Sequence, residues 1–194
     1  MKRCPWSEGS KLYRDYHDNE WGVPVHDDRI LFEFLILESM QAGLSWITIL
    51  KKRKRFNQVF DNFEFNRIVE YSDQKIDNLL QDKGIVRNKL KVLAAVRNAE
   101  AFIRVREKFE SFDKYIWQFT DGRQKTNRFN KIAEIPTTTA ESIAMSKDLK
   151  KKGFQFIGPK VCYAFMQAIG MVNDHLTTCD RHYQIEKNIT RTQK

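Results

Sequence analysis

The chain has 194 residues, of which 41% are hydrophobic and 30% charged, as in an ordinary globular protein with one core or two small lobes. No run of eighteen apolar residues occurs, which argues against a membrane-spanning protein. No apolar stretch follows the basic first residues, which argues against a secretory signal. The three cysteines are scattered, which argues against a disulfide framework. We therefore expect a cytoplasmic protein without a membrane partner. Lysine and arginine outnumber aspartate and glutamate by 34 to 25, and the charge of +9 favours a polyanionic partner, with nucleic acid ahead of a membrane surface.

The first half of the chain predicts a series of helices. The segment "DDRILFEFLILESMQ" at 27–41 opens on an aspartate that can act as an N-cap and is apolar on most sides, which is typical of a buried central helix. The letters "AGL" at 42–44 interrupt this pattern, and Ser45 can cap a second helix, "SWITILKKRKRFNQVF". Further helices are expected at about 66–71, 73–82, 88–109 and 111–119, with Asn66, Asp73, Asn88 and Ser111 as candidate caps.

The second half begins with a predicted loop at 120–137, which is polar and lacks periodicity. Thr138 and Glu141 have capping-box spacing for a helix that runs to about Lys152, and Pro159 opens another helix, "PKVCYAFMQAIGM". No segment has the alternation of a convincing strand, so the expected fold class is all-α, with residues 1–182 as one unit. Residues 183–194 have little to bury and are expected to form a flexible tail.

The turn between the last two helices has the composition of an anion site. Gly153 can end the incoming helix in the left-handed conformation, and Gly158 lets the backbone turn again. Amides near Gly158 and Lys160 would then point outward at a helix N-terminus, with lysines at 150–152 around them. The segment at about 139–171 resembles a helix-hairpin-helix motif, which grips a DNA phosphate without reading sequence; the alternative is an ordinary pair of helices with a glycine at each end of the turn. The apolar residues of the turn, expected to fill the space between the helices, are Phe154, Phe156 and Ile157.

Two cysteines and two histidines form a candidate metal site. His175 and Cys179 lie four residues apart, so both fall on one face of a helical turn and could bind one ion. A structural zinc site requires four ligands, and Cys4 with His17 can supply the other two. The alternative is four unrelated residues, because ligands so far apart have no informative spacing. The residues left without a role are Cys162, assigned to the core, and His26 and His182, expected at the surface.

Glu38 is an unusual carboxylate, because it lies in the most apolar helix of the chain, where it is costly without partners. Electron-rich rings with a carboxylate are typical of a pocket for a flat, positively charged ligand, such as a base methylated on a ring nitrogen. The alternatives are that Glu38 lies on the wet side of its helix, as Glu33 is expected to do, and that the rings belong to the core. The five rings in question, all within the first 46 residues, are Trp6, Tyr13, Tyr16, Trp21 and Trp46.

Several motifs resemble those of the DNA-3-methyladenine glycosylase I family over about residues 2–182: "RCPW", "YHDNEWGVP", "LESMQAGLSWITILKKR", "GIVRNKLKV", "GFQFIGP", and "MQAIGMVNDH" with Cys179. The resemblance implies a helix-hairpin-helix glycosylase fold whose structural zinc ties the N- and C-terminal regions together. It also implies a monofunctional, monomeric base-excision repair enzyme of the bacterial nucleoid. Such an enzyme flips N3-methyladenine out of alkylated double-stranded DNA and hydrolyses its N-glycosidic bond, leaving an abasic site. The zinc ligands carried over by the resemblance are Cys4, His17, His175 and Cys179.

The resemblance also assigns roles around the pocket. Glu38 matches the carboxylate that recognises the adenine edge, Tyr16 a hydrogen-bonding tyrosine and Trp46 the stacking ring. Leu44, at the tip of "QAGLSW", is a candidate to fill the gap left in the duplex, or else a core leucine. The other aromatic positions of the family, with less defined roles, are occupied by Trp6, Tyr13 and Trp21.

Two residues depart from the pattern. Asp174 lies near the catalytic aspartate of the wider superfamily, yet it adjoins His175, and this family works without that aspartate. Lys160 stands where relatives are expected to have a small polar residue, and it would reinforce a phosphate contact of the hairpin around Gly153 and Gly158. Two other functions remain open: a zinc-stabilised DNA-binding module without turnover, and an enzyme for RNA or another lesion. The pocket residues argue against the first, since a mere binder needs no base pocket.

Overall fold

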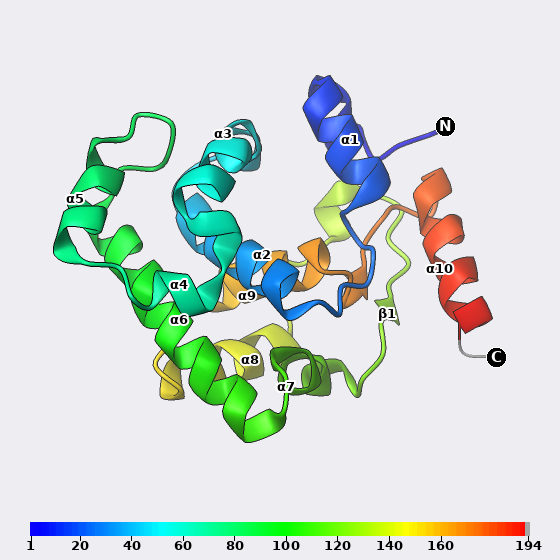
Figure 1. Ribbon diagram of the computed structural model, residues 1–194. Coiled ribbons are helices and arrows are strands. Elements are labelled where there is room, and N and C mark those ends of the chain that lie inside the picture. The colour runs from blue at the N-terminus through cyan, green and yellow to red at the C-terminus, as the bar shows by residue number, and fades with distance from the viewer. Residues whose placement is uncertain (193–194) are drawn as a thin grey trace.

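The computed structural model describes residues 1–192, and these are mostly helical, as the sequence predicts. Figure 1 shows α2 and α9 at the centre, with α1 and α10 on the side where both ends of the described chain lie. No helix of the described part is both long and apolar enough to cross a membrane. In chain order the elements are η1 Pro5–Gly9, α1 Lys11–Asn19, α2 Asp28–Gln41, α3 Trp46–Val59, η2 Asp61–Phe63, α4 Phe65–Ile68, α5 Asp73–Gln81, α6 Lys89–Phe109, α7 Phe112–Trp117, η3 Gln118–Thr120, β1 Lys125–Thr126, η4 Ile132–Glu134, α8 Ala140–Lys151, α9 Pro159–Ala168, β2 Val172–Asn173 and α10 Asp180–Thr192.

Helix α2 is the buried centre of the fold, and every residue from Leu31 to Met40 is shielded from solvent. Its sequence is apolar all round because α3, α6, α7 and α9 pack on its different sides. The Asp27 side chain accepts a hydrogen bond from the Ile30 amide, 2.9 Å away, which is the predicted N-cap. The helix therefore carries any polar side chain in its last two turns into the interior of the protein.

Helices α8 and α9 form the predicted hairpin. Gly153 adopts φ +99° after α8, and the Phe154 amide donates to the Leu149 carbonyl at 3.1 Å, so the helix ends in a left-handed cap. Thr139, not Thr138, caps α8, through a reciprocal bond with Ser142. Phe154 and Ile157 fill the space between the helices, as expected. Phe156 does not, because its φ of +56° turns the side chain outward and leaves it 37% exposed.

A short parallel bridge interrupts the all-helical pattern. Lys125 and Thr126 of β1, within the predicted loop, pair with Val172 and Asn173 of β2. Two residues are too few to show a strand periodicity, so the pattern could not reveal them. The pairing places the segment after β1 beside the end of α9.

The expected flexible tail is helical in the structure as far as Thr192, with only 193–194 outside the described residues. Ile185 is buried on the inner face of α10, so the segment has an apolar contact that its polar composition conceals. His182, expected at the surface, is also buried and makes a 2.8 Å hydrogen bond through Nε2 with the Asn127 carbonyl. His26 is exposed as expected. The amide and carbonyl of Lys2 bond to Asp180, which joins the start of the chain to α10.

Candidate active site

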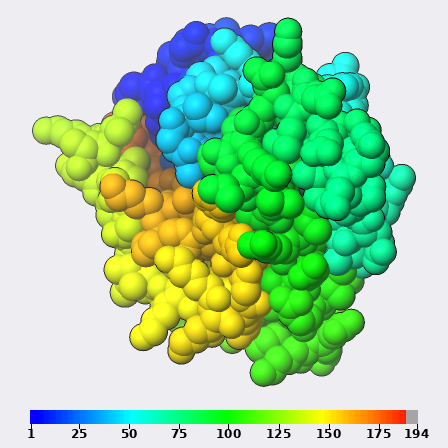
Figure 2. Space-filling model, turned by 90° about the vertical axis from the view of Figure 1, so that its left-hand side faces the viewer, coloured from blue at the N-terminus to red at the C-terminus, as the bar shows by residue number. Residues whose placement is uncertain are grey.

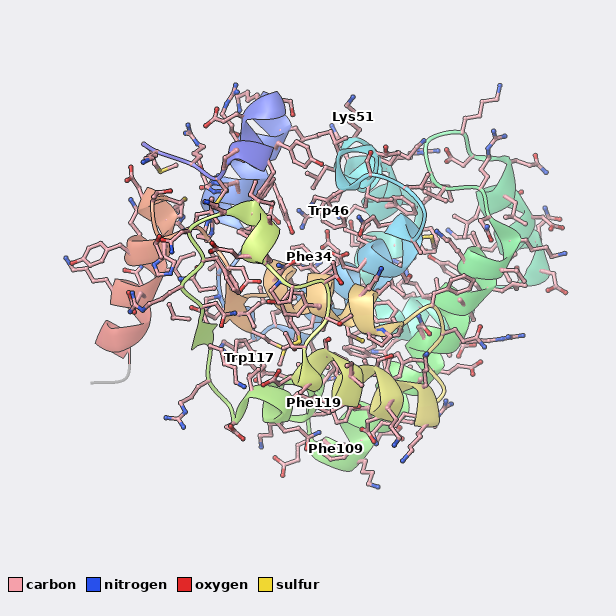
Figure 3. The ribbon with its side chains drawn as sticks, turned by 180° about the vertical axis from the view of Figure 1, so that it is seen from behind. Phe34, Trp46, Lys51, Phe109, Trp117 and Phe119 are labelled. Atoms are coloured by element: carbon pink, nitrogen blue, oxygen red, sulfur yellow. The ribbon has the colours of Figure 1, made fainter. Side chains whose placement is uncertain are left out.

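One cavity of about 870 Å³ gathers the predicted pocket residues from distant parts of the chain. Figure 2 shows this side of the protein, with a hollow bordered by the blue start of the chain, the lime segment near residue 130 and the orange α9. Figure 3 labels Trp46 where α3 begins, in the space between α3 and α1. The predicted residues that line the cavity are Trp6, Tyr13, Tyr16, Trp21, Glu38, Leu44, Trp46 and Lys160.

The aromatic wall is a connected cluster of rings. Trp6 makes edge contacts with Tyr13 and Trp21, at centroid distances of 5.6 and 5.0 Å. Tyr16 and Trp46 face each other at 5.4 Å with their planes tilted by 51°. These rings are thus both packed on one another and open to the cavity, so the sequence alternatives of core and pocket are not exclusive here. Their faces can stack on a flat ligand.

Glu38 is the only carboxylate among the residues lining this cavity. Its side chain is buried, and Oε2 has no hydrogen-bond partner. Burial raises the pKa of Glu38 to about 8, because the ionised form loses its hydration without gaining a cation. A buried, unsatisfied acceptor of this kind indicates a site for a ligand that brings a hydrogen-bond donor or a positive charge.

Glu33, the expected solvent residue, is also buried, which corrects the sequence interpretation. Its Oε1 accepts from Arg53 Nε at 2.7 Å and from Asn57 Nδ2 at 3.2 Å. The two glutamates of α2 are therefore both buried, but they differ in whether the carboxylate has hydrogen-bond partners. Glu33 is paired with side chains of α3, whereas Glu38 faces the cavity unpaired.

Replacing Glu38 with glutamine is expected to stabilise the protein increasingly as the pH rises. Between pH 4.5 and about 8 the carboxyl is ionised in the unfolded chain but keeps its proton in the fold, so wild-type stability falls with pH. Glutamine removes this dependence, and the difference should grow by on the order of 1.4 kcal/mol per pH unit. Urea unfolding at pH 5, 6.5 and 8 measures it. A difference that stays constant with pH would contradict the assignment.

Tyr13 and Tyr16, two of the three tyrosines that line the cavity, have different roles. Tyr16 is buried, and burial with the nearby Glu38 raises its pKa well above the usual value, so its hydroxyl stays neutral and able to donate. The Tyr13 hydroxyl accepts from the Ile47 amide at 3.1 Å and satisfies a donor that the first turn of α3 leaves without a partner inside the helix. Tyr13 thereby joins α1 to α3 and holds Trp46 near Tyr16.

Next to this wall, Cys4, His17, His175 and Cys179 form a fully buried group that could hold a metal ion. His175 Nδ1 lies 3.1 Å from His17 Nε2, 3.7 Å from Cys4 Sγ and 3.6 Å from Cys179 Sγ. Tetrahedral Zn²⁺, with bonds of about 2.0–2.3 Å to nitrogen and sulfur, needs ligand atoms roughly this far apart. Residues from both ends of the chain are thus placed around one point.

The surroundings of the four residues fit a metal as well. His17 Nδ1 is 2.7 Å from Asp18 Oδ1, and His175 Nε2 is 2.9 Å from the Trp21 carbonyl, so each ring is oriented through its second nitrogen. Burial lowers the pKa of His175 and favours the neutral imidazole. A hydrogen bond between the thiols lowers the pKa of Cys179 and raises that of Cys4, with the histidines further favouring the Cys179 thiolate.

Comparison of the sequence and the fold with known proteins identifies one family. The family model described as methyladenine glycosylase matches residues 6–182. The chain belongs to the methyladenine glycosylase family. A curated relative, DNA-3-methyladenine glycosylase 1 of Escherichia coli (strain K12), is 44% identical over 179 residues, which are 92% of this chain and 96% of the relative. This chain is therefore a DNA-3-methyladenine glycosylase, an enzyme of base-excision repair that acts on alkylated DNA.

Solved structures of the family have the same fold as this glycosylase. A crystal structure of 3-methyladenine DNA glycosylase I matches with a TM-score of 0.90 and 46% identity over 92% of this chain and 98% of that one. A second, from Staphylococcus aureus, described as the structural basis of 3-methyladenine recognition, matches with a TM-score of 0.89 and 34% identity. It covers 92% of this chain and 95% of its own.

Asp174 of the glycosylase lies outside the residues that line the cavity. The side chain is fully buried and accepts from the Tyr163 hydroxyl at 2.6 Å, Gln167 Nε2 at 2.8 Å and Asn127 Nδ2 at 2.7 Å. A carboxylate with three donors is satisfied, and here it holds two residues of the cavity wall, Tyr163 and Gln167. The geometry favours this orienting contact over a part in the chemistry.

Part of the wall of the glycosylase's cavity was not predicted from the sequence. Four residues of the predicted loop, Ile132, Ile135, Pro136 and Thr137, line the cavity together with the aromatic cluster. Lining residues that were not predicted include Gln41, Ile132, Ile135, Pro136, Tyr163 and Gln167. The signal that could have found the loop is its pair of isoleucines, which a purely solvated loop does not need. The hairpin glycines, Gly153 and Gly158, are not among the lining residues, whereas Lys160 at the start of α9 is.

Proposed function

We propose that this glycosylase flips N3-methyladenine out of double-stranded DNA into the aromatic cavity and hydrolyses its N-glycosidic bond as a monofunctional enzyme. The observation that carries the proposal is the Glu38 carboxylate, buried among rings with Oε2 unpartnered. Normal adenine is neutral, whereas adenine methylated at N3 within DNA carries a positive charge. The methylated base therefore gains most from the rings and the carboxylate.

In the proposed complex Trp46 stacks on the base, Glu38 contacts the adenine edge and Tyr16 donates a hydrogen bond from its neutral hydroxyl. A cation in the cavity favours the ionised form of Glu38, which offsets the cost of burying that carboxylate. Trp6, Tyr13 and Trp21 complete the aromatic wall around the base. Together these residues discriminate methylated from normal adenine by both charge and shape.

The chemical step needs little help from an acid. Because the base is already cationic, the bond between the sugar C1′ and the base nitrogen breaks with its electron pair going to the base, which leaves neutral. Water then adds to C1′ and releases a proton, giving an abasic site. The negative charge of Glu38 close to the reacting sugar stabilises the positive charge that develops there in the transition state. No lysine is assigned a covalent step, in keeping with a glycosylase without lyase activity.

The DNA is proposed to lie across the face shown in Figure 2, where the azure turn after α2 and the yellow end of α8 are both exposed. Leu44, 41% exposed at the tip of that turn, would fill the space vacated by the flipped base. The hairpin would act as a helix-hairpin-helix motif, with amides near Gly153 and Gly158 and the ammonium of Lys160 binding a phosphate.

We further propose that the four-residue group binds a structural Zn²⁺. Cys4, His17, His175 and Cys179 would supply all four ligands, and the ion would cross-link the two ends of the chain. Four protein ligands leave the ion no open position, so its contribution is to stability. We propose that the enzyme works as a cytoplasmic monomer on the bacterial nucleoid.

Base release from methylated DNA tests the function. The protein is incubated with duplex DNA treated with a methylating agent, and freed bases are identified by chromatography and mass spectrometry. We expect 3-methyladenine to be released, 7-methylguanine to be retained, and the strand to stay intact until alkali cleaves the abasic site. Folded, zinc-loaded protein that binds the duplex but frees no base would indicate a binding module instead.

A further inference from the structure

Helix α6 carries two buried polar side chains that reach out to two different loops. Lys91 and Asn98 are 6% and 0% exposed, although both residue types normally prefer solvent. They lie seven residues apart, which is two helical turns, so they project from the same face about 10 Å apart along the axis. Neither lines the aromatic cavity or belongs to the metal cluster.

Lys91 holds the end of α2. Its Nζ donates to the carbonyls of Met40 and Ala42, each at 2.7 Å. These are carbonyls that a helix C-terminus leaves unpaired, and a cation there is favoured by the helix dipole. The next residues, Gly43 with φ +83° and the exposed Leu44, form the tip of the turn. Lys91 therefore fixes the stem from which Leu44 projects.

Asn98 holds the hairpin in the same way. Its Oδ1 accepts from the Gln155 amide at 2.7 Å, and its Nδ2 donates to the Gln155 carbonyl at 3.2 Å. One side chain thus pairs with both backbone groups of a residue midway between Gly153 and Gly158. The back of Gly153 also lies against α6, since a Cβ there would be 3.2 Å from Arg104 and 4.0 Å from Ala101.

We propose that Lys91 and Asn98 are positioning residues that make α6 a rigid spacer between the Leu44 turn and the phosphate-binding hairpin. The inference rests on the proposed function of those two loops. A duplex gripped by the hairpin must present the lesion at a fixed distance from Leu44 and the cavity. A buried polar contact from α6 to each loop sets that distance, because alternative positions of either loop leave a buried group unpaired.

Substitutions of the two residues should therefore have different effects on base release and on duplex binding. Lys91→Met keeps the aliphatic stem but frees the Leu44 turn, and we expect single-turnover release of 3-methyladenine from duplex DNA to fall about 100-fold, the cost of a misplacement near 1 Å. Duplex affinity and its salt dependence should be retained. Asn98→Leu should instead weaken duplex binding and reduce the slope of log K against log salt by about one, as expected for one lost phosphate contact.

The affinity for free 3-methyladenine, followed by tryptophan fluorescence, separates positioning from damage to the fold and should stay within threefold of wild type in both variants. Lys108→Met, with the same charge change at the exposed far end of α6, is the matched control. If Lys91→Met does not fold, Lys91→Gln, which can still donate to one carbonyl, should show a smaller loss of the same kind.

Three outcomes decide the proposal. Slower base release with unchanged duplex affinity in Lys91→Met, together with weaker duplex binding in Asn98→Leu, supports the proposal. Release rates within threefold of wild type, or losses that parallel the loss of free-base affinity, overturn it while leaving the glycosylase function in place. A wild-type protein that releases no 3-methyladenine under the same conditions overturns the proposed function, and the positioning role with it.

Discussion

Replacing Glu38 with alanine is expected to reduce release of 3-methyladenine by roughly 100- to 1000-fold, the usual effect of removing one electrostatic group aimed at a developing charge. The carboxylate is buried beside the aromatic wall without a partner, so nothing else in the cavity can replace its charge. Duplex affinity should be largely kept, since Glu38 lies inside the cavity and carries no phosphate contact. Single-turnover release and duplex binding, measured on the same preparation, test both parts.

Glu33→Gln is the matched control for this experiment. It alters a second buried glutamate of α2, but one that is bonded to Arg53 and lies outside the cavity lining. It should lower the free energy of unfolding and leave base release within a few-fold of wild type. If Glu38→Ala released 3-methyladenine as fast as this control, the assignment of Glu38 would be wrong.

Replacing Cys179 with serine is expected to remove the bound zinc and cost several kcal/mol of folding stability. The buried group links Cys4, just before η1, and His17 of α1 to the segment before α10, so its loss frees both ends of the chain at once. In small zinc domains the free energy of metal binding is a large part of the free energy of folding. Zinc content by mass spectrometry and the thermal midpoint Tm give the two readouts.

The remaining cysteine provides the control. Cys162 is buried in α9 away from the group, so Cys162→Ala should keep one zinc per chain and lose only the stability expected for a small cavity. A Cys179→Ser protein with full zinc content and an unchanged Tm would refute the structural-zinc proposal. Stripping the wild type with a chelator should reproduce the effect of the serine variant.

The helices of this fold were largely predictable, because their signals are local. The helix from 27 has its aspartate cap, and the hairpin has glycine and proline at the expected ends. The bridge between β1 and β2 was not predictable, since its two pairs are formed by segments some 47 residues apart. Helix α10 was also not predicted, because its packing depends on the residues that lie opposite Ile185.

The candidate site was predictable in its residue types but not in its arrangement. Rings in the first 46 residues and one carboxylate suggested the pocket, and the family resemblance supplied the roles. Periodicity could not separate Glu33 from Glu38, because both are buried and differ only in whether a side chain of α3 reaches them. Lys91 and Asn98 look like ordinary helix-surface residues in the sequence, and only their contacts distinguish them.

The aromatic wall also makes the protein its own optical probe. Three of the protein's four tryptophans, Trp6, Trp21 and Trp46, line the cavity. Trp21 makes an edge contact with the ring of His175, at a centroid distance of 4.6 Å. The fourth, Trp117, stacks on His26 elsewhere. A Trp117→Phe protein would therefore emit only from the cavity, so one unlabelled sample could report entry of a base and loss of the metal in real time.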